Sequence, residues 1–179
     1  MSKKILLVTC LAAVGLYLCG KVYADGRKYI GVSKCKICHM SDSKGNQYKI
    51  WSESKHAKAY QDLASEAAKK SAEKAGLKTD PQKSPECLKC HVTGFGLKDD
   101  LKDASFNIAD GVGCETCHGA GGDYKGLSVM KDKQKAIAAG LIIPTKEACV
   151  KCHNAESPNF KGFDYDKYYK EIAHPAPKK

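Results

Sequence analysis

The sequence has little apolar bulk for a chain of its length. Only 8% of its 179 residues are aromatic, and its mean hydropathy is −0.44. It also lacks a run of the roughly 18–20 consecutive apolar residues that would span a bilayer. Acidic and basic side chains alternate too closely for a disordered tail. These shortages exclude an integral transporter, a collagen-like chain and a disordered protein. They favour a core built partly from something other than side chains.

The first residues have the pattern of a secretory signal peptide. Two lysines precede an apolar stretch over 5–18, and a cleavage point is expected near Ala24. An uncleaved anchor is the alternative, and only such an anchor would attach the protein to a membrane. We therefore expect residues 1–24 to be a signal peptide and residues 25–179 to form a single domain. The mature protein is expected to work in the bacterial periplasm.

Beyond residues 1–24, cysteine occurs only in one repeated pattern. All eight of these cysteines belong to C-x-x-C-H motifs, which we number first to fourth along the chain. In this motif two thiols on one helical turn form thioethers with the vinyl groups of a haem, and the adjacent histidine binds the iron as proximal ligand. The predicted attachment cysteines are Cys35 and Cys38, Cys87 and Cys90, Cys114 and Cys117, and Cys149 and Cys152. The predicted proximal ligands are His39, His91, His118 and His153.

Other chemistries compete with haem attachment for these cysteines. C-x-x-C pairs also form Cys₄ zinc sites, but zinc would leave the histidine after every second cysteine unexplained in all four motifs. Four disulfides are a further possibility in an oxidising compartment. A thioredoxin-like dithiol does not fit, because nothing in the chain resembles a βαβ unit. The expected cofactors are therefore four haem c groups, whose macrocycles would supply buried apolar surface that the side chains lack.

Histidine is too scarce to bind every iron from both sides. Four six-coordinate irons need eight axial ligands, whereas the chain has six histidines, four of them proximal. His56 and His174 are left as candidate distal ligands, and the sequence does not identify the iron that each would serve. Met130 is a further candidate through its thioether, although methionine ordinarily packs in a core. At least one iron is therefore expected to have an open or weakly held sixth position.

The basic charge of the chain does not indicate a nucleic acid partner. The formal net charge is +10, but each haem carries two propionates that offset part of it. A lysine-rich face for an acidic redox partner is the alternative to an ordinary solvated surface. The expected partners are redox proteins and no nucleic acid.

Helical patterns dominate the sequence, and no alternating strand pattern appears. Helices are expected over 47–76, 132–139 and 164–173, the first two closed by a glycine. The residues expected to cap the helices of the first, second and fourth motifs are Ser33, Ser84 and Thr145. The predicted fold class is mainly α with extensive loops, a small multihaem cytochrome fold with a core of four covalently bound haems.

Several segments together resemble the tetrahaem cytochrome c-554 family. Besides the C-x-x-C-H motifs, they are Trp51-x-x-Ser54-x-His56-Ala57, Gly111-Val112-Gly113-Cys114-Glu115-x-x-Cys117-His118-Gly119 and Ile172-Ala173-His174-Pro175. The likeness extends over nearly all of residues 30–175. It implies a mostly helical, loop-rich fold around closely packed haem pairs, a periplasmic electron carrier, and one iron that lacks a strong distal ligand.

The resemblance also bears on the distal ligands. It implies His56 as a distal ligand through the Trp51 segment, and His174 more loosely. The interval between the second and third motifs is short here and holds no histidine. The carrier for which the family is named has a longer insertion at this place, which supplies a further distal histidine.

Electron transfer between redox proteins is the function that these features favour, and it requires no substrate pocket. The alternative is a multihaem reductase or oxidase that acts on a small nitrogen or oxygen species at an open iron. No C-x-x-C-Lys variant and no acid–base cluster point to an enzyme. The sequence therefore assigns no catalytic residue.

The stoichiometry of haem tests this interpretation directly. The purified mature protein is expected to contain four haems per chain in a pyridine haemochrome assay, with the corresponding covalent mass and no titratable thiols. A colourless protein that contains zinc instead would contradict it.

Overall fold

The structure, a computed structural model, describes residues 26–175, so the expected signal peptide and its cleavage point lie outside the described residues. Within them the chain forms short helices joined by long loops, with one isolated parallel β-bridge between Tyr29 and Lys102 and no strand. The mainly α, loop-rich fold class is confirmed. Among residues 26–175, every helix is too short or too polar to cross a bilayer.

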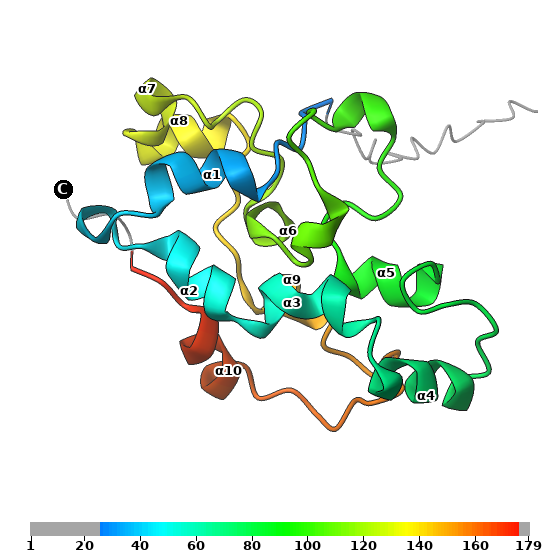
Figure 1. Cartoon of the computed structure of the whole chain (residues 1–179). Coiled ribbons are helices and arrows are strands. Elements are labelled where there is room, and N and C mark those ends of the chain that lie inside the picture. The colour runs from blue at the N-terminus through cyan, green and yellow to red at the C-terminus, as the bar shows by residue number, and fades with distance from the viewer. Residues whose placement is uncertain (1–25, 176–179) are drawn as a thin grey trace, which may run out of the picture.

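The α-helices are α1 (Val32–His39), α2 (Gln47–Glu53), α3 (Lys55–Asp62), α4 (Glu66–Lys74), α5 (Pro85–His91), α6 (Cys114–His118), α7 (Leu127–Met130), α8 (Lys133–Ala138), α9 (Lys146–Val150) and α10 (Tyr165–Ile172). Three single-turn 3₁₀ helices lie between them, namely η1 (Asp42–Lys44), η2 (Asp99–Leu101) and η3 (Ile108–Asp110). In Figure 1 α6 lies near the centre of the molecule, with the first helices of the chain beside it. α1 packs against α6, and α3 packs against α5.

Local sequence signals set several helix boundaries as expected. Ser84 precedes α5, which begins with Pro85, a residue suited to the first helical position. α4 is followed by Gly76 with a positive φ of 74°, and the Leu77 amide donates to the Ala72 carbonyl at 2.9 Å. This is the geometry of a Schellman C-cap, for which glycine is the favoured residue.

Two expectations about helices are wrong. The stretch over 47–76 is divided into three helices, because Ser54 and Ser65 adopt extended backbone angles between them. The Ser65 hydroxyl accepts a hydrogen bond from the Ala68 amide, so this serine begins a new helix. Ser33 does not cap the first motif helix, since α1 begins one residue earlier, after Gly31 with its φ of 76°.

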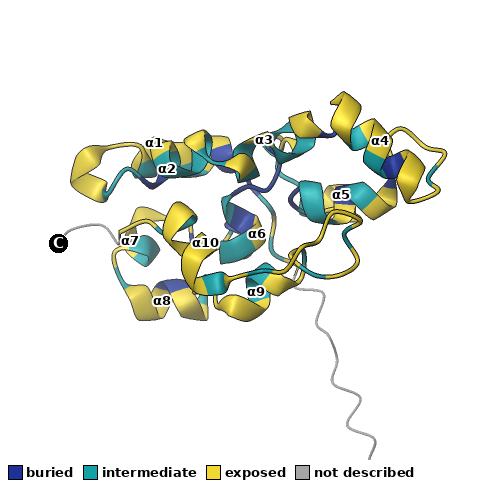
Figure 2. Ribbon diagram, turned by 90° about the horizontal axis from the view of Figure 1, so that it is seen from below, coloured by how far each residue is buried: buried dark blue, intermediate teal, exposed yellow. Residues whose placement is uncertain are grey.

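The protein's own core is small. In the described part of the chain nine apolar residues are buried, and only Leu63, Leu88 and Val92 among them form a cluster. Figure 2 shows buried residues as isolated patches on helices that are otherwise exposed or partly exposed. This thin core agrees with a fold in which haem supplies much of the buried apolar surface.

One buried carboxylate connects α6 to two other segments of the chain. Glu115, only 3% exposed, accepts hydrogen bonds from the backbone amides of Ile30, Gly31 and Gly121 at 2.7–3.1 Å. These bonds satisfy amides that no helix or strand uses. Glu115 therefore connects the third motif to the segment that precedes the first motif. It also connects the third motif to the glycine-rich loop that follows this same motif.

Substitution of this carboxylate is expected to destabilise the fold. Glu115→Ala would leave three amides without an acceptor, and we expect the free energy of unfolding to fall by about 3 kcal/mol, since a hydrogen bond to a charged group contributes about 1.5–3 kcal/mol. Denaturant unfolding followed by circular dichroism measures the loss. The exposed Glu147 is the matched control, and Glu147→Ala is expected to change stability by no more than about 0.5 kcal/mol. Equal effects of the two substitutions would contradict the role assigned to Glu115.

Candidate haem-binding sites

Three of the four C-x-x-C-H motifs lie wholly on helices. The first, second and third motifs lie at the ends of α1, α5 and α6, so each pair of thiols and its histidine share one helical surface. The fourth differs, because α9 ends at Val150 and leaves Cys152 and His153 in the turn that follows. The expectation that both thiols of every motif lie on a helix therefore holds for three motifs.

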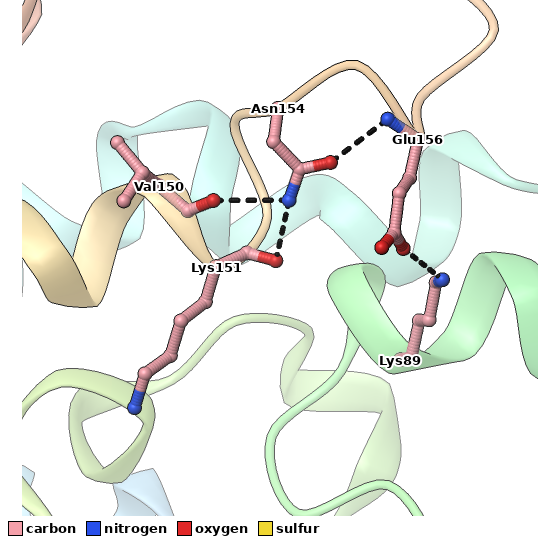
Figure 3. A network of polar contacts seen from close by, with 5 residues as sticks. All are labelled: Lys89, Val150, Lys151, Asn154 and Glu156. Atoms are coloured by element: carbon pink, nitrogen blue, oxygen red, sulfur yellow. Dashed lines mark hydrogen bonds and ion pairs between the residues drawn. The ribbon is translucent and has the colours of Figure 1, made fainter.

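An asparagine stabilises the turn at the fourth motif. The Asn154 side-chain amide donates to the carbonyl oxygens of Val150 and Lys151, at 2.9 and 3.0 Å (Figure 3). Its own carbonyl oxygen accepts from the Glu156 amide at 2.9 Å. The Glu156 carboxylate then pairs with Lys89, which lies between the two cysteines of the second motif. This exposed ion pair adds little stability, but it places the second and fourth motifs side by side.

Two predicted proximal histidines have their rings oriented by backbone carbonyls. The His91 Nδ1 lies 2.8 Å from the Ala59 oxygen, and the His118 Nδ1 lies 3.0 Å from the Ile142 oxygen. A carbonyl oxygen only accepts, so both Nδ1 atoms carry the proton. The Nε2 lone pair of each ring is therefore free to bind a metal, the arrangement that metal-binding histidines ordinarily have.

The ring of His39 is oriented by a side chain instead. Its Nδ1 lies 3.1 Å from the Gln47 Oε1. The Gln47 Nε2 faces two carbonyl oxygens, those of Lys44 and Pro175, so the amide orientation is fixed and Oε1 must accept. The His39 Nδ1 is thus protonated and its Nε2 is free.

The His153 ring makes no hydrogen bond to another described residue, although the His153 backbone amide donates to the Cys149 carbonyl at 3.0 Å. The ring stacks on Phe163, with centroids 4.6 Å apart and an interplanar angle of 11°. Phe163 stacks in turn on Tyr168 of α10, at 5.7 Å and 10°. Aromatic packing, rather than an acceptor for Nδ1, therefore orients the fourth predicted proximal ligand.

The two remaining histidines each face a predicted proximal histidine. The ring centroids of His56 and His153 are 6.0 Å apart, and those of His118 and His174 are 5.8 Å apart. Two imidazoles bound to opposite sides of one metal, through nitrogens about 2 Å from it, have ring centres about 6 Å apart. The chain's own residues therefore fit an iron between each of these pairs.

The environment of these rings favours the neutral imidazole that binds metal. Burial, with the charge of His153, lowers the pKa of His56. Burial likewise lowers the pKa of His118, and desolvation lowers the pKa of His174. At neutral pH each ring therefore keeps an unprotonated nitrogen.

Thiols of different motifs contact one another. A side-chain hydrogen bond to Cys114 is the first of several causes that raise the pKa of Cys35. Burial, followed by the charge of Cys90 and a hydrogen bond to it, raises the pKa of Cys152 to about 12. The first motif is thus beside the third, and the second beside the fourth.

The two alternative uses of the cysteines find no support in the geometry of residues 26–175. No group of three or more His, Cys, Asp or Glu side chains in this range could hold a metal ion by itself. All eight motif cysteines in it are free of disulfides.

The segment that begins at Trp51 contacts the glycine-containing segment before the third motif. The Trp51 Nε1 donates to the Val112 carbonyl at 2.8 Å, and the Val112 amide donates to the His56 carbonyl at 3.0 Å. A Cβ atom on Gly111 would lie 2.7 Å from the same His56 oxygen, so this position requires glycine. The segment before the third motif therefore holds the N-terminal end of α3, and with it His56.

Several residues that position the predicted ligands carry no recognisable signal in the sequence. Gln47, Phe163 and Asn154 act through contacts that are remote in the sequence or lie outside any motif. Met130, the third candidate distal ligand, is half-buried at the end of α7. The structure pairs it with no histidine ring, so its role stays a prediction.

Comparison with known proteins identifies the family. The family model for cytochrome c554 and c-prime matches residues 34–119. Cytochrome c-554 of Nitrosomonas europaea is 32% identical over 178 residues, which cover 89% of this chain and 73% of that protein. The solved structure of reduced cytochrome c554 from the same organism matches with a TM-score of 0.54 and 28% identity, over 81% of this chain and 78% of that one. The chain therefore belongs to the cytochrome c-554 family and is a c-type cytochrome that carries four haem c groups and works in electron transfer.

Proposed function

We propose that this protein is a periplasmic carrier that passes electrons between two redox proteins through four haems, one at each C-x-x-C-H motif. The observation that carries the proposal is the pairing of imidazoles at 6.0 and 5.8 Å. An iron bound by two imidazoles has no vacant position for a substrate, so it can exchange electrons but cannot bind a reactant. Covalent haem c would supply the one-electron Fe(III)/Fe(II) couple.

The attachment of each haem follows from the motifs. The eight motif cysteines would form the thioethers, and His39, His91, His118 and His153 would be the proximal ligands. The Nδ1 contacts of the first three histidines support this assignment, since they leave Nε2 free. In the fourth motif the stacked rings behind His153 would have the same orienting role.

The distal ligands follow from the ring pairs. His174 would bind the iron of the third motif and His56 the iron of the fourth. The chain has no other histidine, so the irons of His39 and His91 would lack a distal imidazole. Met130 remains a candidate for one of them, and its thioether would raise the potential of that haem.

The contacts between motifs support an order for the four haems. The thiols of the first and third motifs are adjacent, as are those of the second and fourth. The charge of Cys149 also contributes to the raised pKa of Cys117, which connects the third motif to the fourth. Electrons would therefore pass along the order first, third, fourth, second, between partner proteins at the two ends.

The location is proposed from the sequence alone. Covalent haem attachment and the signal-peptide pattern of residues 1–24 both suit an exported protein of the periplasm. We also propose that residues 25–179 form a single domain. The support is that contacts between the motifs and other segments extend from α1, which packs against α6, to α10, whose Tyr168 stacks on the Phe163 beside His153.

A second function is favoured by one observation, which is that among the described residues the ring pairs are those of His56 with His153 and of His118 with His174, and His39 and His91 belong to neither. Besides burial, the charge of the nearby His39 lowers the pKa of both His118 and His174, but His39 forms no ring pair with them. An iron with a free position there would bind a small nitrogen or oxygen species and could reduce or oxidise it. The sequence has neither a C-x-x-C-Lys variant nor an acid–base cluster that would indicate an enzyme. The carrier function therefore stands first.

Removal of each proposed distal ligand tests the assignment. In His174→Gly and in His56→Gly, one bis-imidazole iron is expected to become high-spin in electron paramagnetic resonance of the oxidised protein. Carbon monoxide binding to the reduced protein is expected to rise by one haem per chain. Added imidazole should restore the low-spin signal. The exposed Asn159 provides the control, and Asn159→Gly should alter neither measurement. Unchanged spectra in a histidine variant would refute that ligand.

Kinetics separate the carrier from the enzyme. We expect the reduced protein to pass electrons rapidly to a monohaem cytochrome c in stopped-flow mixing. We expect no sustained turnover of nitrite, nitric oxide, hydroxylamine or peroxide with an artificial electron donor. Substantial steady-state turnover of any of these would make the second function the primary one.

A further inference from the structure

Gln47 is a polar side chain in a place where glutamine is rarely found. It is the first residue of α2 and is only 8% exposed, whereas glutamine is usually at the surface. Its amide is fully engaged, because Oε1 accepts from the His39 Nδ1 and Nε2 donates to the carbonyl oxygens of Lys44 and Pro175. The bond to Pro175, at 2.8 Å, spans 128 positions of the sequence.

The turn before Gln47 is shaped for this contact. Gly45 has a φ of 92°, and Asn46 is left-handed with a φ of 47°. A Cβ atom on Gly45 would lie 2.8 Å from the Gln47 Nε2 and 3.0 Å from the Pro175 oxygen. Glycine therefore leaves room for the C-terminal segment to reach the amide.

The two ends of this contact belong to different haem sites. His39 is the proposed proximal ligand of the first haem. Pro175 directly follows His174, whose ring lies 5.8 Å from His118 and is the proposed distal ligand of the third haem. We propose that Gln47 is a positioning residue for both irons, because it orients the His39 ring and holds the segment that presents His174. The proposal rests on the ligand assignments of the proposed function.

The chemistry of an amide makes the role specific. A neutral amide both accepts and donates, so one side chain serves an imidazole N–H and two carbonyl oxygens. A carboxylate of the same size only accepts, and it would keep the bond to His39 but repel the Pro175 oxygen. A thioether of similar size would make neither contact.

Gln47→Glu and Gln47→Met are therefore expected to shift the potential of the first haem in opposite directions. Both are expected to remove the same bis-imidazole iron. Gln47→Glu should lower the potential of the first haem, because a charged acceptor makes the His39 imidazole a stronger donor to iron. Gln47→Met should raise that potential, because the acceptor is lost. Both should release His174 and remove one of the two bis-imidazole irons, which halves the bis-imidazole band in near-infrared magnetic circular dichroism. A general loss of structure would not give opposite shifts of one potential.

The experiment uses the holoprotein, with redox titration of each haem signal and magnetic circular dichroism of the oxidised form. Gln134 is exposed on α8, and Gln134→Glu and Gln134→Met are the matched controls, expected to leave potentials and band intensity unchanged. If Gln47→Met does not assemble with haem, the potential of the first haem and the bis-imidazole band of Gln47→Glu test the proposal alone. A full bis-imidazole band with an unshifted first potential in Gln47→Glu would overturn the proposal.

His174→Gly separates this proposal from the ligand assignment beneath it. If that variant loses one bis-imidazole iron while the Gln47 variants keep both, the positioning role fails and the ligand assignment stands. If His174→Gly itself changes nothing, the assignment of the third haem fails instead.

Discussion

The number of histidines, relative to the axial positions of four haem irons, is the constraint on which this structure depends. Six histidines must serve four haem irons, and the fold brings the two that lie outside the motifs to within about 6 Å of His118 and His153. The pairing divides the haems into two kinds. The third and fourth would be closed by two imidazoles, and the first and second would depend on a weaker ligand or none. An iron bound by two imidazoles suits electron transfer, whereas an iron with an open sixth position would be able to bind a small ligand.

The polypeptide around these sites mainly positions the predicted haem ligands. Its apolar core is small, and several polar side chains connect segments that are remote in the sequence. Glu115 binds the amides of two segments to α6, and Gln47 connects the first motif to the segment that holds the C-terminal histidine. Such contacts are directional, so they fix the angle of an imidazole ring where apolar packing alone would only fill space.

Sequence reasoning succeeded where chemistry is local. The C-x-x-C-H spacing led to the haem type and number, and Pro85 and Gly76 marked helix boundaries through their own backbone preferences. It failed where the outcome depends on tertiary contacts. Nothing local shows that Ser54 interrupts a helical stretch, or that His174 meets His118 rather than another ring. Gln47 carries no local signal either, because its partners are brought to it by the fold.

The central claim is that two irons, and only two, are bound by imidazole on both sides. Near-infrared magnetic circular dichroism of the oxidised wild-type protein, with spin quantitation by electron paramagnetic resonance, counts such irons directly. We predict two bis-imidazole haems per chain, and two haems with a high-spin or a thioether-type signal. A count of fewer than two or of more than two bis-imidazole haems in the monomer would contradict the account.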